Sequence, residues 1–154
     1  MSLQFHIAKH LRDVYFGGNS TAVNYKDTLA GVSWQKAVQK VHDFNTIATL
    51  VFHTNYYIAA VLKVLDGEEL NAKDAYSFDH PPVENEEDWQ QMLDKTWNEA
   101  HTFAKKIEAL PEGIFWEVFS DEKYGNYFRN LTGIIEHLHY HLGQIILIKK
   151  LINN

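Results

Sequence analysis

Two histidines one helical turn apart, His137 and His141, have the spacing in this chain that is best suited to chemistry. Residues four apart on an α-helix share a face, and two imidazoles in this arrangement are a recurrent metal-ligand pair. A third imidazole, His53, lies within the largely apolar run 50–60. Three neutral imidazoles facing one point suit a divalent ion of the zinc or nickel type. We therefore predict that His53, His137 and His141 bind one such ion.

The predicted helix around this pair has an apolar stripe, and both histidines lie close to it. At about 100° per residue counted from Ile134, His141 lies about 20° away and His137 about 60° away on the same side. His139 lies about 140° away on the other side and is not their partner. The alternative is a set of core histidines without metal, each hydrogen-bonded to a carbonyl or carboxylate, because an unsatisfied buried polar group costs about 1–3 kcal/mol.

The chain's six other histidines offer no comparable set; they stand at positions 6, 10, 42, 80, 101 and 139. His6 and His10 repeat the i,i+4 spacing. Their neighbours Lys9, Arg12 and Asp13 are charged, however. We therefore expect His6 and His10 to be surface residues.

Length and composition indicate one soluble domain over residues 1–154. A hydrophobic content of 45% and an aromatic content of 14% supply a large core, which excludes a disordered chain. The net charge is −6 and no block of lysine or arginine occurs, which argues against a nucleic-acid partner. There is no cysteine, so a bound metal must be held by nitrogen and oxygen.

The N-terminal residues lack the basic start and continuous apolar core of a signal peptide. No uninterrupted run of about 18 apolar residues occurs either, which argues against a membrane-spanning segment. A cytoplasmic location is the resulting expectation.

Hydrophobic periodicity predicts four helical segments, and strict strand-like alternation is nearly absent. Their expected ranges are about 2–16, then 34–41 leading with or without a break into 44–65, then 86–110, and finally about 130–152. Gly17 and Gly18 end the first segment, and Ser33, Asn85 and Asn130 are the expected N-caps. A short amphipathic piece is expected at 114–119. We predict an all-α four-helix bundle, whose long connections leave its topology open.

With these helices placed, the chain resembles the DinB-like superfamily of metal-binding four-helix bundles. The matching features are His53 in an apolar second helix and His137 and His141 in the last, followed by Gly143-Gln144-Ile145. The resemblance spans essentially the full length. It implies an up-down-down-up topology, a divalent metal on the three imidazoles, and often a homodimer. Some members of the superfamily are transferases or isomerases that use a small thiol such as bacillithiol, mycothiol or glutathione.

Three histidine ligands leave a coordination position open, where a water would have its pKa lowered toward about 7 or an external thiol would be activated. No general acid or base stands out in the sequence. Glu136 falls about 200° from the stripe and is expected to be solvated. Arg129 and Asn126 could reach a substrate, but a turn at Gly125 and Asn126 is the simpler interpretation.

These observations favour a divalent-metal-dependent enzyme, either a small-thiol S-transferase or a hydrolase. One alternative is a non-catalytic metal-binding or interaction module, and another is a bundle with three hydrogen-bonded histidines and no metal. A homodimer is expected from the resemblance. It is also expected because four tryptophans in a chain of this size exceed what one core holds; they are Trp34, Trp89, Trp97 and Trp116.

Overall fold

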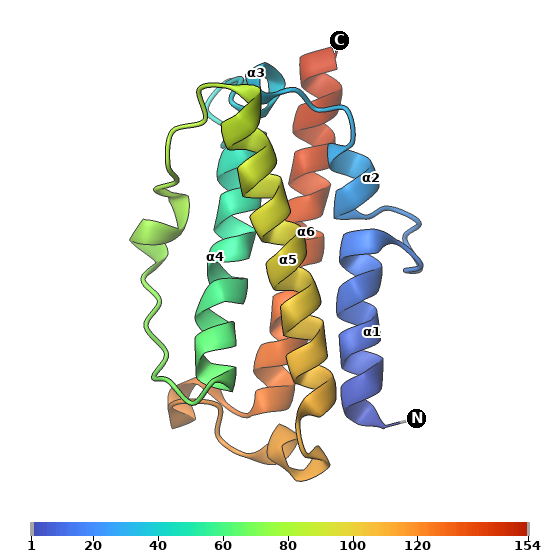
Figure 1. Cartoon of the computed structure of the whole chain (residues 1–154), viewed down its shortest axis with the longest axis vertical. Helices are drawn as coiled ribbons and strands as arrows, with labels where there is room; N and C mark the ends of the chain where they lie inside the picture. The colour runs from blue at the N-terminus through green and yellow to red at the C-terminus, as the bar shows by residue number, and fades with distance from the viewer. Residues whose placement is uncertain (1, 154) are drawn as a thin grey trace.

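Four long α-helices form a bundle in the computed structural model, which describes residues 2–153 (Figure 1). They are α1 (Leu3–Phe16), α4 (Ile47–Leu65), α5 (Glu86–Ala109) and α6 (Tyr127–Asn153). The expected all-α class is confirmed: within 2–153 no strand is assigned, and the one β-type contact is an isolated bridge between Val118 and Asn126.

The long helices form a ring in which each packs against two neighbours. Helix α5 lies between α1 and α4, and α6 closes the ring between α4 and α1. In Figure 1, α1 and α6 run upward from N to C, whereas α4 and α5 run downward. The chain therefore returns from the bottom of α4 to the top of α5 through the long connection 66–85, which passes along the outside of α4. Because α4 and α6 are antiparallel neighbours, the middle of one faces the middle of the other.

The predicted helix ends are correct where the local signal is strong. Gly17 follows α1 with φ of 104°, a left-handed conformation that favours glycine. The Ser33 side chain accepts a hydrogen bond from the backbone N–H of Lys36, and Asn85 accepts one from Asp88 at the start of α5. Each cap satisfies a backbone donor that the first helical turn leaves free.

Two predicted starts are wrong. The second long helix begins at Ile47 rather than near Phe44, because Thr46 accepts the capping hydrogen bond from the backbone N–H of Thr49. The last helix begins at Tyr127, so Asn130 lies inside its first turn and is not the cap. The Asn126 side chain instead accepts the hydrogen bond from the Arg129 backbone N–H.

The connections contain short helices that periodicity is too weak to predict. Helix α2 (Tyr25–Leu29) is capped by Asn24 and was not expected, and α3 (Trp34–Ala37) ends before the predicted 41. Three 3₁₀ turns complete the fold: η1 (Asp74–Phe78), η2 (Glu112–Trp116) and η3 (Glu122–Tyr124). The amphipathic piece expected at 114–119 overlaps η2 over residues 114–116.

The core lies between the four long helices, and α4 supplies its most apolar wall. Length and composition alone would let α4 cross a membrane, but 61% of its apolar 18-residue window is buried inside the bundle, as is usual for a core helix. As expected, the core does not enclose all four tryptophans: Trp89 is fully buried, whereas Trp116 is 65% exposed.

Candidate metal centre

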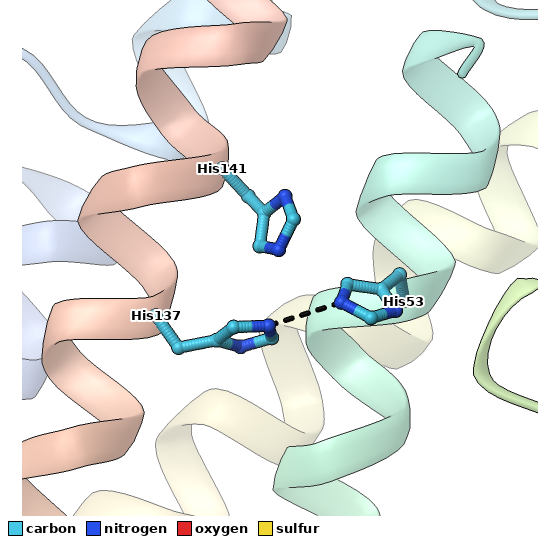
Figure 2. A group of neighbouring side chains, drawn as sticks. All are labelled: His53, His137 and His141. Carbon is cyan, nitrogen blue, oxygen red and sulfur yellow. Dashed lines mark hydrogen bonds between the residues drawn. The ribbon is translucent and has the colours of Figure 1, made fainter. Parts of the chain in front are cut away.

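The three predicted ligands meet in the seam between α4 and α6. His53 projects from the middle of α4, and His137 and His141 project from adjacent turns of α6 toward it (Figure 2). One ring nitrogen from each lies within 4.8 Å of the others. His53 and His141 are buried, with 4% and 7% of their surface exposed, and His137 is half-buried. Regular helices on both sides hold the cluster, so its geometry does not depend on a loop.

The two closest nitrogens are the Nε2 atoms of His53 and His137, 3.0 Å apart. Two nitrogens bound to one tetrahedral ion at 2.0–2.1 Å would lie about 3.3 Å apart. The His53 and His137 rings therefore need to move by only a few tenths of an ångström to share an ion, and the His141 nitrogen, within 4.8 Å of both, would have to move closer. Without an ion, one of the two nitrogens must carry a proton for the pair to be a hydrogen bond.

The outer nitrogen of His53 is held by the connection between α4 and α5. Its Nδ1 lies 2.8 Å from the Ser77 hydroxyl oxygen. That hydroxyl donates its own hydrogen to the Asp74 carbonyl oxygen at 2.6 Å. Because a hydroxyl has one hydrogen to give, the Ser77 oxygen accepts from His53 Nδ1–H. His53 therefore presents the lone pair of Nε2 to the cluster, and His137 Nε2–H is the donor between them.

Gln144 orients His141 in the same way. The Gln144 amide oxygen lies 2.8 Å from His141 Nδ1, and an amide oxygen accepts only. His141 therefore carries its proton on Nδ1, which leaves its Nε2 lone pair free. An outer hydrogen bond that fixes the tautomer of a ligating histidine is a regular feature of metal sites. Two of the three imidazoles are thus held in the metal-binding tautomer.

Aromatic rings wall the cluster on the α4 side. The Phe78 ring stacks on the His53 ring at a centroid distance of 4.1 Å. The Tyr57 ring lies edge-on to both His53 and His137, with centroids 5.3 and 5.1 Å away. The Tyr57 hydroxyl donates to the Asp74 carboxylate at 2.6 Å. These contacts join the connection 66–85 to the cluster and reduce the access of water to His53.

All three imidazoles are neutral at pH 7. Burial, reinforced by His141, lowers the pKa of His53 and of His137 to about 4. Burial also lowers the pKa of His141, against the opposing effect of its hydrogen bond to Gln144. Burial and the bond to Asp74 raise the pKa of Tyr57 to about 12. Neutral imidazole is the form that binds a metal, so the chemistry of the donor set fits a divalent ion.

The remaining sequence candidates lie outside the cluster. His6 and His10 are exposed, as expected, and His10 faces His139 with ring centroids 5.9 Å apart. Glu136 is exposed, which agrees with a solvated glutamate. Asn126 serves as the helix cap described above, and Arg129 is exposed, so the turn interpretation of that segment is the one that the structure supports.

Sequence reasoning missed residues that hydrogen-bond to or pack against the three histidines. Ser77 and Phe78 lie in a connection without periodicity, and no local signal indicates that they return to His53. Gln144 did have such a signal, because it follows His141 by three residues and residues at that spacing are neighbours on a helix.

Comparison of the chain with protein-family models, with curated proteins and with solved structures finds no match. The protein is therefore classified by its own fold and candidate site. It is an all-α bundle whose two antiparallel core helices bring three neutral histidines together.

Proposed function

We propose that the protein is a divalent-metal-dependent enzyme of the DinB-like kind, with His53, His137 and His141 as the ligands of one zinc or nickel ion. The observation that carries the proposal is the pair of outer hydrogen bonds from Ser77 and Gln144, which turn two Nε2 lone pairs toward a common point. A role in the core alone requires a hydrogen-bond partner for each imidazole, but it does not require three imidazoles whose inner nitrogens face one another.

The course of the chain supports this assignment. Helices α1 and α6 run one way and α4 and α5 the other, which is the arrangement expected of the superfamily (Figure 1). The predicted ligands also occupy the second and fourth long helices, as the resemblance requires.

The chemistry follows from the number of ligands. A divalent ion held by three imidazoles keeps a position for a substrate, where it would polarise a carbonyl or lower the pKa of a thiol. Ser77 and Gln144 keep the ligand nitrogens oriented, and Phe78 and Tyr57 limit the access of water to His53. Because the chain has no cysteine, a thiol would come from a small-molecule substrate. The reaction that we propose is S-transfer from such a thiol, or hydrolysis.

One observation favours a second candidate, a non-catalytic metal-binding or interaction module. His53 and His141 are almost completely buried, which is more typical of a structural site than of a catalytic one. His137 is only half-buried and is the most accessible of the three histidines. We further propose that the protein is a cytoplasmic homodimer without a nucleic-acid or membrane partner.

Elemental analysis of untagged protein, purified without added metal, tests the proposal. We expect close to one zinc or nickel per chain, and we expect His141→Ala to lower the occupancy at least about tenfold, since loss of a supporting group alone has that effect. His139→Ala is the matched control, because it removes a partly buried histidine from the same helix but outside the cluster. Full metal content in His141→Ala would contradict the proposal.

A further inference from the structure

A groove of about 500 Å³ lies one helical turn from the histidine cluster. Its lining is apolar, with polar groups at both ends: Asp43, Phe44, Asn45, Leu50, Gln144, Leu147, Ile148, Lys150 and Leu151. The volume falls within the range of about 300–1,000 Å³ that is usual for small-molecule sites. Three of the apolar side chains, those of Phe44, Leu147 and Leu151, are also exposed, which is unusual for a purely structural surface.

The groove and the cluster occupy the same seam. Leu50 precedes His53 by three residues on α4, and Gln144 follows His141 by three on α6. Because these helices are antiparallel, both steps lead toward the same end of the bundle, the upper end in Figure 1. The groove therefore begins about 5 Å along the seam from the ligands. Gln144 belongs to both features, since it lines the groove and accepts the hydrogen bond from His141 Nδ1.

We propose that this groove binds the apolar part of an amphipathic small-molecule substrate, whose electron-donating end reaches the ion on the three histidines. The inference rests on the proposed function and adds the class of substrate. The apolar middle of the groove would take a hydrocarbon chain or ring. Polar groups of the protein are available to the substrate at the Gln144 end of the groove and at its outer mouth. The mouth carries one acidic and one basic side chain, Asp43 and Lys150, so it does not select a charged molecule of one sign.

A series of alkyl hydroxamates tests the proposal, because the hydroxamate group chelates a metal while the chain length varies. Binding to the zinc-loaded protein would be measured by calorimetry for acetohydroxamate, butanohydroxamate, hexanohydroxamate and octanohydroxamate. Each added methylene that enters the groove should tighten binding about two- to fourfold. From acetohydroxamate to octanohydroxamate the gain should reach at least about fiftyfold.

A substitution in the groove separates specific from general hydrophobic binding. Leu147 is 62% exposed, so Leu147→Glu should fold normally while placing a carboxylate in the apolar lining. We expect this variant to bind acetohydroxamate as the unchanged protein does and to lose the dependence on chain length. Val23→Glu is the matched control, because it changes an exposed aliphatic residue that is not part of the groove.

The possible results are distinguishable. If acetohydroxamate does not bind the zinc-loaded protein, the ion has no open position and the proposed enzyme fails together with this inference. If acetohydroxamate binds but longer chains bind no more tightly, or if the gain persists in Leu147→Glu, the groove proposal alone is overturned. It is also overturned if the gain disappears at protein concentrations where a dimer forms, since a second copy would then occupy the groove.

Discussion

The hydrogen bond from His53 to Ser77 links the histidine cluster to the connection between α4 and α5. It crosses from α4 to the connection that precedes α5, and the Asp74 carbonyl fixes its direction by accepting the Ser77 hydrogen. Without the hydroxyl, no acceptor would hold the proton on Nδ1, and the orientation of the His53 ring would depend on its stacking against Phe78. The buried Nδ1–H would also lose its acceptor, at the cost expected of an unsatisfied polar group.

Ser77→Ala should therefore lower the affinity for zinc by about ten- to a hundredfold while leaving all three ligands in place. Competition with a chromophoric chelator would measure the change. Ser120→Ala, at an exposed position in another connection, is the control and should bind zinc normally. An unchanged affinity in Ser77→Ala would show that Phe78 stacking alone orients the ring.

At the scale of residues, the sequence was sufficient to predict that the three histidines meet, but not to find the residues that hydrogen-bond to them. The spacing of His137 and His141 depends only on helix geometry, and His53 was conspicuous as a polar residue in an apolar run. The position of Ser77 depends on how an irregular connection folds back across α4, which is decided by tertiary packing. The buried face of α6 is also centred nearer to Leu138 and Leu142 than to Ile134, which is only half-buried.

At the scale of helices, the wrong start of α6 shows why helix caps are difficult to predict. Asn126 and Asn130 both precede the apolar period and both are residues that cap helices well. In the structure the Asn130 amide donates to the backbone carbonyl oxygens of Tyr124 and Asn126, while Asn126 caps the helix. The preference for asparagine at a cap is therefore satisfied one turn earlier than predicted.

Asn126→Ala should destabilise the protein by about 1 kcal/mol, because the Arg129 backbone N–H loses its acceptor. Urea unfolding followed by circular dichroism would measure the free energy of unfolding. Asn98→Ala is the control: Asn98 is exposed in the interior of α5, where alanine is the better helix former, and the change should be neutral or stabilising. Equal losses in the two variants would exclude the capping explanation.

The packing of α1 against α5 gives stability a dependence on pH. Arg12 donates hydrogen bonds to both carboxylate oxygens of Glu108, and this contact lowers the pKa of Glu108 from its ordinary 4.5. The folded state therefore holds the Glu108 proton less tightly than the unfolded state does. The stabilisation is complete above pH 4.5 and is lost as the pH falls through the lowered pKa.

Glu108→Gln should remove this part of the acid sensitivity. Both side chains are about one-third exposed, so solvent screening limits the effect to at most about 1 kcal/mol. The free energy of unfolding of the two proteins should differ at pH 7 and converge as the pH falls through the lowered pKa of Glu108. A difference that stays constant over this interval would mean that the carboxylate contributes through packing rather than through its charge.

For the whole molecule, periodicity predicted the class of fold, whereas the course of the chain was an expectation from the resemblance alone. Periods of 3.6 residues and strong caps define helices locally, and four amphipathic helices have few ways to bury their apolar faces other than a bundle. The direction of each helix depends on the three connections, and all of them are long enough to join either end. The parallel placement of α4 and α5 thus follows from the path of residues 66–85 (Figure 1).

The exposed aromatic residues at the lower end of the bundle support the proposed homodimer. The Trp116 ring packs on Phe128, yet the Trp116 side chain remains 65% exposed, and Val118 and Tyr124 are exposed beside it in the sequence. A two-fold axis through this patch would bring the same residues of two copies together and bury them. Such burial would remove the largest exposed side chain of the molecule from water.

Light scattering at micromolar concentration should therefore give the mass of two chains, and Trp116→Ser should give the mass of one. Tyr140→Ser is the matched control, because Tyr140 is equally exposed but lies on α6 outside the patch, and this variant should remain dimeric. A single-chain mass for the unchanged protein would refute the dimer. A dimer that persists in Trp116→Ser and dissociates in Tyr140→Ser would instead place the interface on α6, along the seam that holds the histidines.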